Sequence, residues 1–274
     1  MKFIIVFFLF WPFVLASQVG EERFKIHGEL IPGHLIIGEA ADASRVFLNG
    51  EPLLMSNEGL FVFGFDRDDT GTHMLKIAYI DGTIENISLN LQERAYDIQR
   101  INNLEQRHVS PPASELNRIA KERQIIQNAR RQIDTTQTAY YTSGFVRPVE
   151  GGRITGTFGN QRILNNEPRN PHNGVDIALP TGSPVYAMAD GIVALRGDDF
   201  YYNGNFVLLD HGHGLNSVYV HLHKIHVNDG DFVTKGQLIG EVGSTGRSTG
   251  PHLHWGVQWY QKRIDPMSLL NLQD

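Results

Sequence analysis

The chain has 274 residues, of which 41% are hydrophobic, and it contains no cysteine. This length allows one large or two ordinary domains with packed cores. The formal net charge of -6 provides no basic field to recruit nucleic acid, so we expect no nucleic-acid partner. Without cysteine there are no disulfides, and any metal site must use ligands other than thiolates, such as histidine and carboxylate.

The first residues have the pattern of an export signal. Lys2 precedes the apolar run Phe3–Leu15, and Val14-Leu15-Ala16 fits the small-residue pattern of a cleavage site. The run is shorter than the roughly 20 residues that a membrane-spanning helix needs. We therefore predict a signal peptide over residues 1–16 and an exported chain with no transmembrane segment after cleavage.

Residues 17–95 alternate short hydrophobic segments with turn residues. Asn49-Gly50 and Asp81-Gly82 favour tight hairpins because these residues tolerate positive φ. The spacing predicts a small antiparallel β-sandwich without a catalytic cluster. The expected strands lie near His34–Gly38, Ser44–Leu48, Leu60–Phe65, Met74–Tyr79 and Thr83–Leu91.

Residues 96–140 are charged and rich in glutamine, and they predict a linker with one amphipathic helix. Ser110-Pro111-Pro112 is suited to its start, because serine can cap a helix and proline fits the first turn. Such a helix could pack between domains or contact an anionic polymer or a partner protein. Hydrophobic residues recur at helical spacing at Leu116, Ile119, Ala120, Ile126, Ala129 and Ile133.

Residues 141–274 are mainly short segments with strand character and glycine turns. His252 and His254 follow a Gly-Pro turn, and residues two apart in a strand share one face. His172 and Asp176 are four apart, so an extended chain also presents them to one side. Two imidazoles and one carboxylate are typical ligands of catalytic zinc, with a fourth position left for water.

Two segments with strand–turn–strand character, residues 182–193 and 230–240, also resemble biotinyl and lipoyl carrier domains. A carrier domain needs a lysine at its hairpin tip, whereas Ala187-Met188-Ala189 occupies that place here. The carrier function is therefore disfavoured, although the shared all-β architecture remains.

Three stretches together resemble one family. Residues 171–193 read PHNGVDIALPTGSPVYAMADGIV, residues 217–222 read SVYVHL, and residues 239–257 read IGEVGSTGRSTGPHLHWGV. They resemble the lysostaphin/LytM-type zinc metallopeptidases, which cut peptide bonds in bacterial peptidoglycan, over about residues 145–268. The resemblance implies a mainly β fold, in which residues 141–274 form a barrel-sandwich-like peptidase domain with a duplicated hybrid motif.

The resemblance also implies roles for individual residues. It places one Zn²⁺ per chain on His172, Asp176 and His254, and it gives acid/base and oxyanion-stabilising roles to His252 and His221. Tyr202 is a candidate substrate contact, and Arg162 stands where the family often has arginine. The other histidines of this segment are expected to have structural or rim roles: His211, His213, His223 and His226.

Residues 17–95 resemble the immunoglobulin-like domain that precedes the catalytic domain in some exported members. We therefore expect an exported zinc metalloendopeptidase, in the periplasm of a Gram-negative bacterium, that hydrolyses amide bonds in peptidoglycan stem peptides or cross-links. The expected mechanism uses a zinc-activated water and two catalytic histidines. A non-enzymatic activator of other cell-wall hydrolases is the alternative, and a latent enzyme covered by its N-terminal domain or linker helix is a third possibility.

Overall fold

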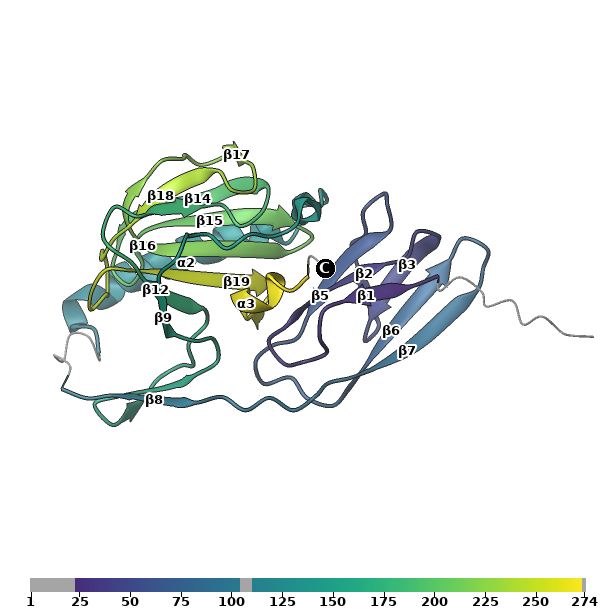
Figure 1. The fold of residues 1–274 in the computed structure, drawn as a ribbon, viewed down its shortest axis with the longest axis horizontal. Coiled ribbons are helices and arrows are strands. Elements are labelled where there is room, and N and C mark those ends of the chain that lie inside the picture. Colours follow the sequence, from purple (N-terminus) through teal and green to yellow (C-terminus); the bar gives the residue numbers. More distant parts are fainter. Residues whose placement is uncertain (1–22, 104–109, 273–274) are drawn as a thin grey trace, which may run out of the picture.

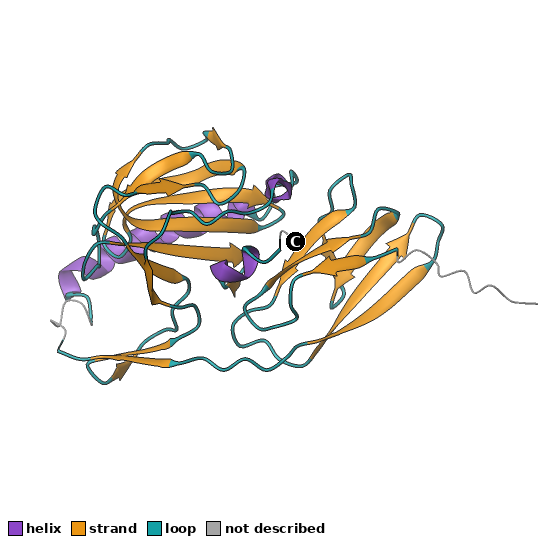
Figure 2. Cartoon of the chain, viewed as in Figure 1, coloured by secondary structure: helices purple, strands orange, loops and turns teal. Residues whose placement is uncertain are grey.

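The computed structural model describes residues 23–103 and 110–272, so the expected signal peptide lies outside the described residues. The fold is mainly β, as the sequence predicts, with strands in both halves of the chain and one long helix (Figures 1 and 2). Within the described ranges, no helix combines the length and hydrophobicity required to cross a membrane.

The N-terminal half consists of two antiparallel sheets. In the second sheet, a hairpin joins strand β3 (Ala43–Leu48) to strand β4 (Glu51–Leu53). It turns at Asn49 and Gly50, which have φ values of 52° and 88°, as the Asn-Gly pattern predicts. The expected strands are confirmed, whereas the three-residue strands β1 and β4 were not predicted. The first sheet has β1 (Lys25–His27), β2 (Leu35–Glu39) and β5 (Leu60–Gly64), and the second has β4 (Glu51–Leu53), β3 (Ala43–Leu48), β6 (Thr72–Tyr79) and β7 (Ile84–Asn90).

The C-terminal half is built on a ten-stranded antiparallel sheet whose main path runs β17-β14-β15-β16-β19-β12-β9. Its centre is tightly packed, because Tyr219 of β16 and Trp255 of β19 are register partners and both are fully buried. The strands are β9 (Arg153–Gly156), β12 (Val175–Ala178), β13 (Pro184–Tyr186), β14 (Gly191–Phe200), β15 (Gly204–Gly212), β16 (Leu215–Ile225), β17 (Phe232–Val233), β18 (Leu238–Val242), β19 (His252–Trp259) and β20 (Lys262–Ile264).

The long helix α2 (Leu116–Ile133) lies against this sheet, preceded by the 3-10 turn η1 (Ala113–Glu115). The predicted amphipathic helix is therefore present, but the expected serine cap is wrong: no side chain caps η1 or α2, and Ser110 Oγ instead accepts a hydrogen bond from Arg169. The predicted apolar face is only partly used. Ala129 and Ile133 pack on Phe206, Leu208 and Val220 of β15 and β16, and Ile119 is also buried, while Leu116 and Ala120 are exposed.

The linker also contains a strand that the sequence analysis did not predict. Strand β8 (Ile98–Ile101) pairs in parallel with β10 (Gln161–Leu164), which in turn pairs with the two-residue strand β11 (Glu167–Pro168). Figure 1 shows β8 at the end of the extended connection between the two halves. The linker thus contributes backbone to the C-terminal half before the helix begins.

The two halves are in direct contact. Gly64 of β5 lies against Ile264 of β20, and a Cβ on that glycine would come within 2.5 Å of the isoleucine side chain. Arg94 of the linker forms an ion pair with Asp265 at 2.5 Å, and Asp265 caps the short helix α3 (Pro266–Leu269). The other short helix of the C-terminal half is the 3-10 turn η2 (Tyr140–Ser143). The boundaries 17–95, 96–140 and 141–274 remain a proposal, as does the immunoglobulin-like kinship of the first domain.

Candidate metal centre and active site

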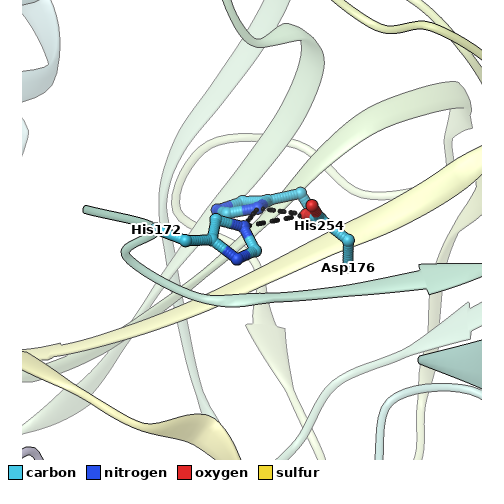
Figure 3. A group of neighbouring side chains, drawn as sticks. All are labelled: His172, Asp176 and His254. Carbon is cyan, nitrogen blue, oxygen red and sulfur yellow. Dashed lines mark hydrogen bonds and ion pairs between the residues drawn. The ribbon is translucent and has the colours of Figure 1, made fainter. Parts of the chain in front are cut away.

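The pairing of β12 with β19 brings the central candidate residues together. Asp176 of β12 is the register partner of His254 on β19, and His172 reaches the same place from the loop that precedes β12. Figure 3 shows the three side chains converging from these elements. The strand predicted after Pro251 is confirmed as β19, while His172 itself lies outside the strand that carries Asp176.

The three side chains offer one atom each at short mutual distances. His172 Nε2 lies 3.0 Å from Asp176 Oδ1 and 3.0 Å from His254 Nδ1, and the last two atoms are 2.8 Å apart. Tetrahedral zinc with bonds of about 2.0–2.2 Å holds its ligand atoms about 3.3 Å apart, close to this arrangement. Among the described residues, these three form the group of histidine and acidic side chains close enough to hold a metal ion.

The hydrogen bonds of His172 give an independent test of this fit. Its Nδ1 lies 2.9 Å from the carbonyl oxygen of Thr157, and a carbonyl only accepts, so Nδ1 carries the hydrogen. In the neutral ring Nε2 then presents a lone pair to the carboxylate oxygen of Asp176. Two hydrogen-bond acceptors at 3.0 Å repel each other unless a proton or a cation lies between them. The atoms of His172 and Asp176 are therefore arranged as metal ligands would be.

Asp176 is charged and held from two sides. Burial would raise the pKa of its carboxyl, but the adjacent imidazoles of His172 and His254 bring that pKa well below its usual value. On the other side, Arg162 Nη2 donates to Asp176 Oδ2 at 2.6 Å. Burial lowers the pKa of His254, which keeps this imidazole neutral and able to act as a ligand.

His252 and His221 stand beside this group on β19 and β16. His252 Nε2 lies 3.9 Å from Asp176 Oδ1, and the rings of His221 and His252 have centroids 4.7 Å apart. Burial, with nearby His252 and His254, lowers the pKa of His221 to about 3. The structure therefore brings together all five residues to which the sequence analysis assigned metal or catalytic roles.

The backbone at His221 has an unusual conformation. Its φ is 67°, in the left-handed region that residues other than glycine, asparagine and aspartate seldom adopt. The pairing register of β16 slips close by, between Leu222 and Lys224. The regular alternation of side chains is therefore lost after His221, and His223, which would share its face in a regular strand, is exposed.

The site opens into a groove of about 1440 Å³ that also contains Tyr202. The Arg247 guanidinium lies 4.5 Å from the centre of the Tyr202 ring, and Arg247 N donates to the Tyr202 carbonyl at 3.0 Å. Helix α2 borders the same groove through Ile119, Ile126 and Arg130. The groove thus contains the three proposed metal ligands, the imidazoles of His221 and His252, and the arginines Arg130 and Arg247.

The remaining histidines of this segment lie outside that group. His211 is fully buried and contacts Asp190 and Ser217, whereas His213 lies in the β15–β16 turn with a φ of 50°. His226 contacts Glu241 at 3.1 Å. None of these contacts reaches the residues proposed to bind metal.

The sequence analysis assigned no role to three residues that lie near the site. The sequence analysis named Arg162 only as a position where the family often has arginine, and it did not single out Gln99 or Arg247. Arg247 lies within the GSTGRSTGPHLH run and Arg162 shortly after Phe158-Gly159, so motif position was an available signal for both. Gln99 carries no local signal, because its role depends on the unpredicted pairing of β8 with β10.

Comparisons with known proteins agree with this geometry. Residues 170–266 match the model of peptidase family M23. The chain is 45% identical over 104 residues to peptidoglycan DD-endopeptidase ShyA of Vibrio cholerae, covering 38% of this chain and 24% of that protein. It is 38% identical over 124 residues to DD-carboxypeptidase/endopeptidase Mpg of Neisseria meningitidis, covering 45% of this chain and 28% of that protein.

The chain thus aligns with only about a quarter of the length of these curated relatives. A crystal structure of a peptidase M23 candidate from Pseudomonas aeruginosa matches far more of the fold. It superposes with a TM-score of 0.65 and 27% identity, covering 89% of this chain and 96% of that one. Residues 170–266 therefore form a peptidase family M23 domain within this chain.

Proposed function

We propose that this protein is an exported zinc metalloendopeptidase that hydrolyses amide bonds in the stem peptides or cross-links of peptidoglycan, in a Gram-negative periplasm. The observation that carries the proposal is the convergence of His172, Asp176 and His254 beside His221 and His252 in one groove. The name of the Vibrio cholerae relative, peptidoglycan DD-endopeptidase, supports the substrate class, and the name of the Neisseria meningitidis relative supports an endopeptidase.

Zinc would be held by His172 Nε2, Asp176 Oδ1 and His254 Nδ1. When bound, zinc supplies a Lewis acid for the scissile carbonyl and lowers the pKa of a water ligand from 15.7 toward ~7. The Asp176 carboxylate offsets part of the cation's charge, and the hydrogen bond from His172 to Thr157 fixes which nitrogen of that ring faces the ion.

The two other imidazoles handle protons. His252 Nδ1 lies 2.8 Å from the Gly250 carbonyl, so its Nε2 carries the lone pair, and this Nε2 is 3.9 Å from Asp176 Oδ1. His252 Nε2 is therefore placed to take a proton from the attacking water and return it to the leaving amine. His221 holds its Nδ1 2.8 Å from the Thr245 carbonyl, so its Nε2 also carries a lone pair and is a second proton acceptor in the groove.

Tyr202 and Arg247 form the proposed substrate wall of the groove. Within the described ranges Arg247 has no carboxylate partner, and its guanidinium rests on the Tyr202 ring. A carboxylate-bearing peptide, such as a peptidoglycan stem peptide, would supply the missing anion.

The test is to incubate the purified protein with isolated sacculi, with and without a zinc chelator, and to identify the released muropeptides by mass spectrometry. We expect products with a newly exposed amine and carboxylate, and none after chelation or in His172→Ala. A zinc-loaded protein that releases nothing, but stimulates another wall hydrolase, would instead support the non-enzymatic activator.

A further inference from the structure

The two carboxylate oxygens of Asp176 have different neighbours. Oδ1 lies 3.0 Å from His172 Nε2 and 2.8 Å from His254 Nδ1, while Oδ2 accepts from Arg162 Nη2 at 2.6 Å. The side chains of Arg162 and Asp176 are only 27% and 12% exposed. The guanidinium therefore fixes the carboxylate plane and leaves Oδ1 as the oxygen that faces the histidines.

Arg162 is itself held by the linker strand. It lies on β10, and the parallel pairing with β8 aligns it with Gln99. Arg162 Nε donates to Gln99 Oε1 at 3.1 Å, and the neighbouring Gln161 N donates to the Asp97 carbonyl at 2.9 Å. The other partner of β10 is the two-residue strand β11, so β8 provides its longer paired edge.

The segment leading into β8 is anchored on both halves of the molecule, because Arg94 Nη1 and Tyr96 Oη also donate to the Pro32 carbonyl of the N-terminal half, at 3.2 Å and 3.1 Å. Arg94 forms the ion pair with Asp265, and its guanidinium also lies 4.9 Å from the centre of the Tyr96 ring. The Tyr96 ring packs edge-on against Phe158 with centroids 6.3 Å apart, in the loop that leads to β10. The position of Gln99 is therefore set by the packing of the residues that precede it as well as by its pairing with β10.

We propose that linker residues 94–101, which lie outside the segment matched by the family model, are a structural part of the metal site. Arg162 and Gln99 act as positioning residues: Gln99 orients the guanidinium, and the guanidinium restricts Asp176 to binding through one oxygen. Groups that hydrogen-bond a metal ligand change metal affinity by about 10–100-fold when they are removed. The inference rests on the proposed function only for the identity of the metal.

The first experiment measures the zinc dissociation constant by competition with a chromophoric chelator. For Arg162→Gln we expect that constant to rise about 10–100-fold, and for Gln99→Leu by about 3–10-fold, because one hydrogen bond to a charged group is lost. Arg100→Gln is the matched control, since Arg100 is exposed on the same strand and should leave zinc affinity unchanged. Parental affinity in Arg162→Gln, or equal affinities in Gln99→Leu and Arg100→Gln, would overturn the proposal.

A second readout separates positioning from a general structural role. Coordination number governs the visible spectrum of Co²⁺, so the Co²⁺-loaded Arg162→Gln protein should absorb less strongly, as Asp176 becomes free to bind through both oxygens. Arg162→Lys should keep the charge but not the bond to Gln99, and should recover affinity only in part. The contrary result is a Co²⁺ spectrum for Arg162→Gln that equals that of the parent, with a loss of zinc affinity that parallels a lower Tm of the metal-free protein. It would mean that Arg162 only stabilises the fold and does not position Asp176. All of these results are independent of whether peptidoglycan is cleaved.

Discussion

His221 and His252 face each other with ring centroids 4.7 Å apart, and each holds its Nδ1 beside a backbone carbonyl oxygen. The carbonyls belong to Thr245 and Gly250, both at 2.8 Å. Since a carbonyl only accepts, both neutral rings have their hydrogen on Nδ1 and their lone pair on Nε2. The backbone thus presets two imidazoles as proton acceptors on the same side of the proposed metal group.

Replacing either imidazole should separate chemistry from metal binding. We expect His252→Ala and His221→Ala to keep zinc and to lose turnover by about 10²–10⁴-fold, the usual contribution of a positioned acid or base. Metal content and kcat on purified muropeptides would be measured side by side. His223→Ala, at an exposed position two residues away, is the control. Full activity in His252→Ala would refute its role as the base.

Removing a proposed metal ligand should abolish the increase in thermal stability that zinc is expected to cause. The proposed zinc ion would bind the folded site and not the unfolded chain, so excess zinc should raise the Tm of the parent protein. His172→Ala and His254→Ala should show no such rise and no hydrolysis. His226→Ala, whose imidazole contacts Glu241 instead, should respond as the parent does. A normal zinc-dependent shift in His254→Ala would remove that residue from the ligand set.

The sequence predicted those features of the fold and site that depend on neighbouring residues, and it missed those that depend on contacts between distant segments. The even spacing of His252 with His254 correctly anticipated two side chains on one face of a strand, because strand periodicity is a local property. The same argument does not hold for His172 and Asp176, because His172 reaches the group from the loop before β12. The pairing of β8 with β10 joins segments about 60 residues apart, and nothing in Ile98–Ile101 alone distinguishes it from loop. The positive φ of His221 likewise follows from tertiary packing.

Helix α2 should be anchored through its last turns. Ile133 is 1% exposed and packs with Ala129 against β15 and β16, whereas Leu116 is 52% exposed. Ile133→Ala should lower the free energy of unfolding by about 2–4 kcal/mol, through lost burial and the cavity left behind. Leu116→Ala should change it by less than about 0.5 kcal/mol, as is usual at exposed positions. Denaturant titration of both variants would measure the difference, and equal effects would contradict this packing.

Arg247 should act on substrate affinity. Its guanidinium faces the groove over Tyr202 and, in the part of the chain that the structure describes, has no carboxylate partner. Arg247→Gln should raise KM about 10–100-fold on a peptide with a free carboxylate near the scissile bond, because a charge-assisted hydrogen bond is lost. The effect should disappear when that carboxylate is amidated. Arg196→Gln, which breaks an ion pair with Asp198 on β14, is the control. A KM effect that persists on the amidated peptide would instead indicate that Arg247 only supports Tyr202.

His211 should make stability fall in mild acid. Burial lowers the pKa of this imidazole from 6.5 to about 4, although the hydrogen bond and charge of Asp190 act in the opposite direction. Its Nδ1 lies 2.7 Å from the Asp190 carbonyl and its Nε2 lies 2.7 Å from Ser217 Oγ, so the neutral ring has a partner for each nitrogen.

Because the folded pKa lies below the unfolded one, the unfolded chain takes up the proton first as pH falls. The stabilising contribution is complete above about pH 6.5 and is lost between there and about pH 4, by about 3 kcal/mol in total. His211→Gln keeps a neutral polar side chain but cannot titrate. Unfolding free energies measured from pH 7.5 to 5 at constant zinc should therefore fall more steeply for the parent than for His211→Gln. Parallel curves would mean that the buried imidazole is not the group responsible.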